Sequence, residues 1–328
     1  MTSLYGNLVA RQAFSAAIDS GSLHHAWIFA GPEGVGKAQF AMLAARRLLA
    51  GPGQPEDFAI PPGDRTQQLI EAGSHPDLKV LQRLPRDEKK PEQGLARSIR
   101  VDQVRELDHF LGVKATYSDR RVVVIDTADD LERPGASNAL LKNLEEPPAG
   151  TVFLLVSHAP GRLLPTIRSR CRMLRFEPLN DTEMRAALID SGVAAGELDE
   201  LVRVGEGSPA RALAMAGLDI AGLDKALAEL AQGDSSNAVR AELARSLSLK
   251  AAQQRYEAFL ERAPSFIATA ARTRSGEALR IALDAHDAAR NLAAGALGLS
   301  LDAQGTVFEM AGIVARLAPV SPRARSQR

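Results

Sequence analysis

The sequence predicts a parallel α/β domain followed by helical regions, and three features lead to this expectation. Short apolar runs alternate with helical patterns over the first half of the chain, which is typical of a mostly parallel sheet covered by helices on both faces. A glycine-rich segment lies between the first expected strand and the first long helix. After Pro178 the β pattern fades, and the sequence becomes rich in Ala and Leu with helical character.

Four runs rich in Val, Ile, Leu and Phe are the expected strands, and a fifth run is a candidate. They show little alternation of apolar and polar residues, which indicates strands that are covered on both faces. The four runs are 26–31, 78–82, 121–126 and 151–157, and the candidate is 172–179. These strands would form one parallel sheet.

Three helical patterns separate the strands, at 38–50, 102–112 and 137–146. The third is stopped by Pro147 and Pro148, because the residue before a proline is disfavoured in a helix.

The pattern over 102–112 predicts an amphipathic helix with Asp102 as its N-cap. Its apolar face consists of Val104, Leu107, Phe110 and Leu111. Two further stretches, 51–77 and 84–98, are rich in Pro, Gly, polar or charged residues and are expected to be loops or insertions.

The overall charge is balanced, with 40 basic and 40 acidic residues. This balance argues against a protein whose main task is to bind nucleic-acid phosphates, although it does not exclude local basic patches. The single cysteine, Cys171, rules out a disulfide framework within the chain and a multi-cysteine zinc site. No secretory signal or membrane-spanning run is visible, so a cytoplasmic location is expected.

The segment GPEGVGK at 31–37 matches the phosphate-loop pattern. It follows an expected strand and opens an expected helix, so backbone N–H groups and the helix N-terminus would surround phosphate oxygens. Lys37 would reach the terminal phosphates. This context favours a phosphate-loop fold over a glycine-rich turn without chemical meaning. The residues of this site are Gly31, Gly34, Val35, Gly36, Lys37 and Ala38.

Two departures from the intact motif predict little or no ATP hydrolysis. The position that normally carries a Mg²⁺-binding hydroxyl is Ala38. Asp126 ends a strand and is placed to hold Mg²⁺, but Thr127 follows where this class of ATPase has a water-activating Glu. Asp129 and Asp130 are expected to be solvated loop acids. Since the cradle and its lysine are kept, nucleotide binding itself is left open.

Three segments together resemble the bacterial clamp-loader family. They are SLHHAWIFAGPEGVGKA at 22–38, SNALLKNLEEPPAGTVFLLVSHAPGRLLPTIRSRC at 137–171 and GEGSPARAL at 205–213. Within that family the motor subunit carries intact nucleotide motifs, whereas this chain resembles the subunits in which they are degraded. The resemblance covers residues 1 to 217 well, and the remainder is similar only in length and helical character.

The resemblance implies an AAA+ fold in consecutive domains. These would be a RecA-like nucleotide-binding-fold domain over 1–178, a small helical lid over 179–218 and a helical collar over 219–318. The end of the chain, 319–328, is expected to be a disordered tail.

The resemblance also implies partners and a role in DNA replication. Five collars, including those of motor and delta subunits, would pack into a hetero-pentameric ring. The ring would open a sliding clamp and place it on primer–template DNA, using ATP bound between subunits. No intrinsic catalysis is expected, and any polymerase activity would come only from membership in the DNA polymerase III holoenzyme.

Ser169, Arg170 and Cys171 match the family's arginine-finger motif, which implies that Arg170 reaches into the ATP site of a neighbouring subunit. A guanidinium there stabilises charge on the transferred phosphoryl group. Without the resemblance, the arginines of this segment would be interpreted as an ordinary solvated basic face: Arg168, Arg170, Arg172 and Arg175. Cys171 by itself is expected to be a small buried apolar residue rather than a nucleophile.

Two further residues match sensor positions of the family. Arg211 matches the lid arginine that senses nucleotide in cis, and loss of hydrolysis leaves open whether it is vestigial. Ser157 matches the polar sensor at the tip of the fourth strand, and a strand-end serine bound to nearby backbone is the equal alternative.

Many family members carry a four-cysteine zinc module before a His-Pro-Asp like the one at 75–77. This chain lacks those cysteines, so no zinc is expected, and ATP is expected to bind weakly or not at all. His24 and His25 are expected to pack or form hydrogen bonds rather than to bind a metal.

Two rival functions stay open at this point. One is an active AAA+ motor ATPase of DNA metabolism, against which Ala38 and Thr127 speak. The other is a regulatory phosphate-loop module in a different assembly, which only the identity of its partners would distinguish.

Overall fold

The computed structural model divides into two compact units, Met1–Leu213 and Ala214–Arg328. Of the tail expected at 319–328, all but residue 319 lies outside the described residues. Within the part that is described, no helix is long and apolar enough to cross a membrane. The residues that the structure describes are 4–55, 57–61, 63–87, 89–90, 94–299 and 301–319, without the side chains of 297–299.

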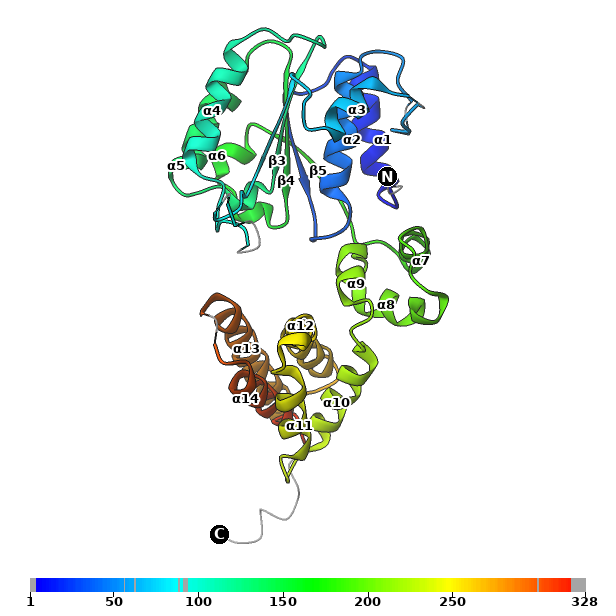
Figure 1. Cartoon of the computed structure of the whole chain (residues 1–328), viewed down its shortest axis with the longest axis vertical. Helices are drawn as coiled ribbons and strands as arrows, with labels where there is room; N and C mark the ends of the chain where they lie inside the picture. Colours follow the sequence, from blue (N-terminus) through cyan, green and yellow to red (C-terminus); the bar gives the residue numbers. More distant parts are fainter. Residues whose placement is uncertain are drawn as a thin grey trace. The chain divides into compact units, whose positions relative to one another are not determined.

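The first unit contains a five-stranded parallel sheet in the order β2-β3-β4-β1-β5 (Figure 1). All five expected strands are present, which confirms the predicted α/β class, although β5 is shorter than its apolar run. Their bounds are β1 Ala26–Ala30, β2 Leu78–Gln82, β3 Arg121–Asp126, β4 Thr151–Ser157 and β5 Arg172–Arg175.

Helices cover both faces of the sheet, as Figure 1 shows. On one face lie α1 (Leu8–Asp19), α2 (Lys37–Leu49) and α3 (Arg65–Glu71). On the other lie α4 (Val101–Gly112), α5 (Gly135–Glu145) and the short α6 (Pro165–Arg168). This two-sided cover explains why the strands carry almost uninterrupted apolar sequence.

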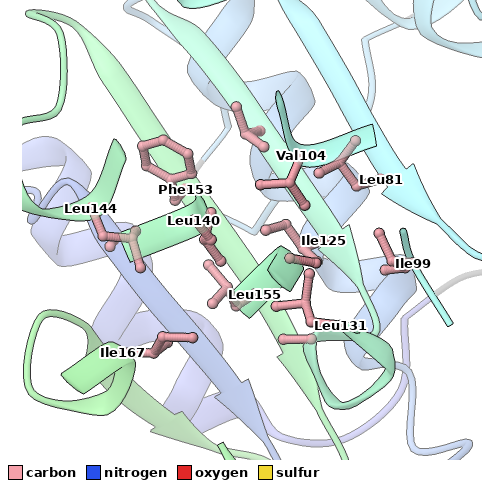
Figure 2. Packing of buried hydrophobic residues seen from close by; sticks show 14 of the residues in the cluster. Leu81, Ile99, Val104, Ile125, Leu131, Leu140, Leu144, Phe153, Leu155 and Ile167 are labelled. Carbon is pink, nitrogen blue, oxygen red and sulfur yellow. The ribbon is translucent and has the colours of Figure 1, made fainter. Parts of the chain in front are cut away.

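The apolar core therefore has two layers. Alternate residues of β1 enter different layers, with Ile28 in the layer beneath α4 and α5 and Phe29 in the layer beneath α1 and α2. In the second layer Phe29 packs against Phe14 and Phe40 with ring centroids 5.5 and 5.0 Å away. Figure 2 shows labelled members of the first layer: Leu81, Ile99, Val104, Ile125, Leu131, Leu140, Leu144, Phe153, Leu155 and Ile167.

The expected N-cap of α4 is wrong by two residues. The helix begins at Val101, so Arg100 is its N-cap, and the Gln103 side chain accepts a hydrogen bond from the Arg100 N–H at 3.0 Å. Asp102 lies inside the first turn, where its exposed carboxylate is 3.7 Å from Arg105. The favourable charge of Asp102 near the helix N-terminus is thus kept without a capping bond.

The insertion at 51–77 is not wholly irregular, because it contains α3. Asp64 is the N-cap of this helix and accepts a hydrogen bond from the Gln67 N–H at 2.6 Å. The Asp64 carboxylate also pairs with the fully buried Arg46 of α2 at 2.5 Å. One carboxylate therefore starts α3 and ties the insertion to the domain.

Helices alone follow β5 in the described residues. The first unit continues through α7 (Asp181–Asp190) and α8 (Leu198–Gly205), and α9 (Pro209–Met215) contains the boundary to the second unit. In the second unit, Arg262 of α12 forms a two-pronged ion pair with Asp224 of α10. The helices of that unit are α10 Ile220–Gln232, α11 Ala238–Leu247, α12 Gln253–Ala271, α13 Gly276–Leu299 and α14 Ala303–Ala315.

Candidate nucleotide site and arginine finger

The phosphate loop connects the carboxyl end of β1 to the start of α2, as the sequence predicts. Its glycines are required by backbone shape and by close neighbours. Gly34 and Gly36 have φ of +78° and +92°, which side-chain-bearing residues rarely adopt. A Cβ at Gly34 would lie 2.1 Å from the Ser208 hydroxyl, and one at Gly31 would lie 2.1 Å from the Phe176 carbonyl oxygen. The loop is thus packed closely on the residues after β5.

Lys37 is held at the centre of this loop and is only 2% exposed. Its Nζ donates hydrogen bonds to the carbonyl oxygens of Gly31, at 2.7 Å, and Pro32. Burial lowers the pKa of Lys37 to about 8, although the nearby acids Glu33 and Asp129 act in the opposite direction. Loop carbonyl oxygens therefore take the place of water around the buried ammonium. Phosphate oxygens are acceptors of the same kind, so they would suit the same N–H donors.

A cavity of about 590 Å³ opens beside the loop. It is lined by Lys37, Ala38, Asp126 and Thr127, together with residues of the helices after β5 such as Ala187 and Leu213. Most of the predicted phosphate-loop residues therefore meet Asp126 at this cavity, whereas Gly31 does not line it. Those that do are Gly34, Val35, Gly36, Lys37 and Ala38. Burial raises the pKa of Asp126, against the opposing effect of His158 and Lys37.

The cavity fits a phosphate group better than it fits Mg²⁺. Backbone N–H groups at the start of α2 and the buried lysine suit phosphate oxygens. The metal-binding hydroxyl of an intact loop is replaced by the methyl group of Ala38, so the oxygen ligand set that Mg²⁺ prefers is incomplete. Asp126 is the acid that would hold the ion with bound nucleotide.

The expectation that Asp129 and Asp130 are solvated loop acids is wrong. The Asp129 carboxylate accepts hydrogen bonds from the Ser157 hydroxyl, at 2.9 Å, and from the His158 N–H. Asp130 pairs with Arg83 at 3.0 Å. The short helix Ala128–Asp130 is thus fastened to the end of β4 on one side and to the segment after β2 on the other.

For Ser157 the alternative of a serine bound to nearby backbone is wrong, whereas the sensor interpretation stays a prediction. It does lie at the tip of β4, but its hydroxyl binds a carboxylate rather than backbone. The next residue, His158, lines the cavity and was missed by sequence reasoning. Burial lowers the pKa of His158, with Lys37 adding to the effect. Its position directly after a strand at the carboxyl edge of a parallel sheet is the signal that could have identified it.

Arg211 lies in α9, next to Ser208 and Ala210, which touch the phosphate loop at Gly34. The Ala210 N–H donates to the Gly34 carbonyl oxygen at 3.4 Å. The Arg211 guanidinium pairs with Glu206 at 2.7 Å. In this conformation the arginine is therefore engaged within the lid, while the backbone beside it contacts the loop.

Ser169, Arg170 and Cys171 lie between α6 and β5, and none of them lines the cavity at the phosphate loop. Arg170 is one-third exposed and is held by Glu145 of α5, at 2.7 Å, and by the Thr166 carbonyl oxygen, at 2.9 Å. The other arginines of the segment, Arg168, Arg172 and Arg175, are exposed. Arg170 is therefore less exposed than the other three arginines and is held by two partners, unlike a residue of a solvated basic face.

Cys171 packs against the apolar layer beneath α5 and is partly buried. Burial raises the pKa of its thiol to about 12, so the thiolate is not formed near neutral pH. The apolar packing agrees with the expectation for this residue.

The histidines before β1 behave as expected. His24 Nδ1 lies 3.0 Å from the Ala26 carbonyl oxygen, and His25 Nε2 lies 3.1 Å from the Leu144 carbonyl oxygen. Throughout the described residues, no group of three or more His, Cys, Asp or Glu side chains could hold a metal ion.

Asp77 of the His-Pro-Asp segment has a structural role that sequence reasoning did not assign. It is 1% exposed and accepts hydrogen bonds from the N–H groups of Thr116, Tyr117 and Ser118 at 2.7–2.8 Å. Burial alone would raise the pKa of Asp77, but these hydrogen bonds outweigh it and lower the pKa. The carboxylate thus fixes the loop that leads into β3.

The strand order, the phosphate loop and the helices that follow them define an AAA+ nucleotide-binding-fold protein. Comparisons with known proteins refine this class. A family described as "DNA polymerase III, delta subunit" matches residues 7–180. The chain belongs to this family, and the resemblance to clamp-loader subunits is thereby confirmed.

The similar proteins include delta prime and gamma/tau subunits of DNA polymerase III. DNA polymerase III subunit delta prime of Pseudomonas aeruginosa is 40% identical over 190 residues, which cover 56% of this chain and 53% of that protein. Subunit gamma/tau of Mycobacterium bovis is 33% identical over 202 residues, covering 60% of this chain and 32% of that protein. The crystal structure of a gamma subunit-related protein of Thermotoga maritima covers 93% of this chain and 98% of its own, with 18% identity and a TM-score of 0.47. The chain spans about half the length of the delta prime relatives it matches.

Proposed function

We propose that this chain is a delta prime-type subunit of a bacterial clamp loader that does not hydrolyse ATP itself and supplies an arginine finger to a neighbouring subunit. The observation that carries the proposal is the separation of two sites. The cavity at the phosphate loop has Ala38 and Thr127 where hydrolysis needs a metal ligand and a base. Arg170 lies outside that cavity with a partly exposed guanidinium.

The chain's own site is a phosphate cradle without the remaining machinery for hydrolysis. Lys37 and the loop glycines would hold phosphate oxygens, and ATP without a well-bound metal ion would be held weakly. Thr127 has no carboxylate to activate water, and Asp129 is engaged by Ser157 and His158. The loss of a metal ligand together with a general base commonly costs orders of magnitude in rate.

Arg170 would act in trans. An arginine brought to a neighbour's nucleotide stabilises the charge that develops on the phosphoryl group, and such a contact is worth about 10³- to 10⁵-fold in rate. The neighbour would be a motor subunit of the gamma/tau kind, to which this chain is itself similar.

The remaining parts of the chain would serve assembly. Residues 179–218 would be the lid and 219–318 the collar that joins a ring with motor and delta subunits. The ring would bind a sliding clamp and place it on primer–template DNA. In this proposal Arg211, paired with Glu206, is a vestige of a nucleotide sensor.

Reconstitution tests the proposal. A loader assembled from motor, delta and clamp proteins should place clamps on primed circular DNA only when this chain is added, while the chain alone should hydrolyse no ATP above background. Substantial turnover by the isolated chain would instead identify a motor ATPase. A regulatory module of another assembly would be indicated by two results together: clamp loading proceeds equally well without the chain, and the chain does not join the ring.

A further inference from the structure

Arg170 is fixed from two sides although its side chain is partly exposed. Its Nη2 lies 2.7 Å from Glu145 Oε1, and its Nη1 donates to the Thr166 carbonyl oxygen at 2.9 Å. A free arginine side chain on a surface samples many rotamers, whereas one with a partner on each Nη has a defined orientation. Guanidinium has five N–H donors, so donors remain for a phosphate after these two partners are satisfied.

The partners of Arg170 come from elements that are themselves well anchored. Glu145 is the last residue of α5, which is stopped by Pro147 and Pro148. Leu144, next to Glu145, is 1% exposed in the core layer shown in Figure 2. The backbone position of Glu145 at the end of α5 is therefore fixed by the packing of its neighbour Leu144.

The backbone that carries the arginine is anchored in the same way. Ile167 is 1% exposed, and the Arg170 N–H donates to the Ile167 carbonyl oxygen at 3.1 Å. Cys171 packs on the same apolar layer. The guanidinium thus stands on a short turn between two anchored residues, with α5 supplying the carboxylate that sets its direction.

We infer that Glu145 is a positioning residue for the arginine finger: its carboxylate holds the Arg170 guanidinium in the orientation in which it meets a neighbouring subunit's nucleotide. This inference rests on the proposed function of Arg170. Glu145 touches no nucleotide itself and acts only through the arginine. Its neighbour Glu146 is similarly exposed, has the same chemistry and forms no ion pair in the described structure, so the two glutamates differ in the contact that matters.

The test is ATP hydrolysis by a reconstituted loader in which only the motor subunit next to this chain can hydrolyse ATP. Glu145→Gln keeps the size of the side chain but removes its charge. We expect a fall in kcat of about ten-fold with an unchanged KM for ATP, because misorientation weakens a contact made in the transition state. Glu145→Asp, which keeps the charge on a shorter side chain, should lie between wild type and Glu145→Gln. Glu146→Gln should match wild type.

A double variant separates positioning from other roles. If Glu145 acts through the arginine, Glu145→Gln combined with Arg170→Ala should be no slower than Arg170→Ala alone. The inference would be overturned if the rate losses of Glu145→Gln and Arg170→Ala multiplied in the double variant. It would also be overturned if Glu145→Gln hydrolysed ATP at the wild-type rate while Arg170→Ala was slow. Either result would leave the proposed role of Arg170 in place. An unchanged rate for Arg170→Ala would instead overturn the proposed function. Ring assembly, measured by gel filtration, should be normal for Glu145→Gln. If assembly of Glu145→Gln is impaired, the rate of ATP hydrolysis with Glu145→Asp tests the positioning role instead. A wild-type rate with Glu145→Asp would then reject that role.

Discussion

At the scale of single residues, buried charges in this chain are satisfied by several partners each. Lys37 is bound to loop carbonyls, and Asp77 is bound to three consecutive N–H groups. A buried charge without such partners would cost several kcal/mol, of the order of 3–5 when one partner of a buried pair is removed. The two residues differ in the role proposed for them: Lys37 would exchange its carbonyl partners for phosphate oxygens, whereas Asp77 holds the loop that leads into β3.

Replacement of Asp77 by Asn should therefore destabilise the first unit by about 2–4 kcal/mol at pH 7, because an amide offers one acceptor oxygen where three N–H groups need two. Urea denaturation measures the loss. Asp119→Asn, at an exposed position nearby, should change stability by less than about 0.5 kcal/mol. Equal stability of Asp77→Asn and wild type would contradict the role given to this carboxylate.

The same substitution has a defined pH dependence. The folded-state pKa of Asp77 is lowered, so its stabilisation is present above the unfolded-state pKa of about 4 and is lost as the pH falls through the folded-state value. The difference in stability between wild type and Asp77→Asn should consequently shrink as the pH falls below about 4. A difference that stays constant down to pH 3 would argue against this linkage.

Residue-scale prediction from sequence succeeded where a motif fixes chemistry and failed where partners are distant in sequence. Two of the three loop glycines, Lys37 and Asp126 line one cavity because the carboxyl ends of parallel strands share an edge. The pairing of Arg170 with Glu145 could not be predicted, since it depends on how α5 packs beside α6. Asp129 was misjudged for the same reason, because its partners come from β4.

At the scale of elements, the insertion after α2 is joined to the domain by a buried ion pair between Arg46 and Asp64. Arg46 is fully buried, and its guanidinium binds Asp64, Gln54 and the Ala59 carbonyl oxygen. Burial would raise the pKa of Asp64, but Arg46 and the cap bonds of α3 lower it. These contacts of Arg46 thus tie the described part of the insertion, which contains no cysteine, to the rest of the domain.

Replacement of Arg46 by Met should test these contacts. It leaves Asp64 and the Ala59 carbonyl oxygen without their partner, so we expect a loss of about 3–5 kcal/mol in the free energy of unfolding and faster proteolysis between residues 51 and 64. Arg185→Met, which removes an exposed pair with Asp199, is the matched control and should cost less than about 1 kcal/mol. If both variants lose the same stability, the buried pair is not what holds the insertion.

Elements were predicted correctly from the sequence where their apolar pattern is strong and were missed where it is weak. The strands were found because they are covered on both faces, and Figure 1 shows helices on each side of them. Helix α3 was missed because its seven residues carry little periodic signal amid Pro and Gly. The N-cap of α4 was misplaced because Gln103, rather than an acid, makes the bond to the helix start.

At the scale of the whole molecule, the chain combines a phosphate-loop fold with Ala38 and Thr127 at two positions of the nucleotide motifs. Its zero formal charge fits a subunit that works through protein contacts and through a ring rather than by gripping DNA alone. Two compact units correspond to a nucleotide-binding-fold part and a helical part, each with its own apolar core. A chain of this kind would retain the fold because the neighbour needs Arg170 in a fixed place.

The most direct test of this account is single-turnover ATP hydrolysis at the one competent motor subunit beside this chain, in a ring bound to clamp and primed DNA. Arg170→Ala should slow that step by about 10³-fold without loss of assembly. Arg172→Ala, an exposed arginine of the same segment, should leave it unchanged. A slowed Arg170→Ala beside an unaffected Arg172→Ala would establish a subunit that is inactive in its own site and required in its neighbour's. Equal rates for Arg170→Ala and wild type would contradict the central claim and reduce the chain to a scaffold.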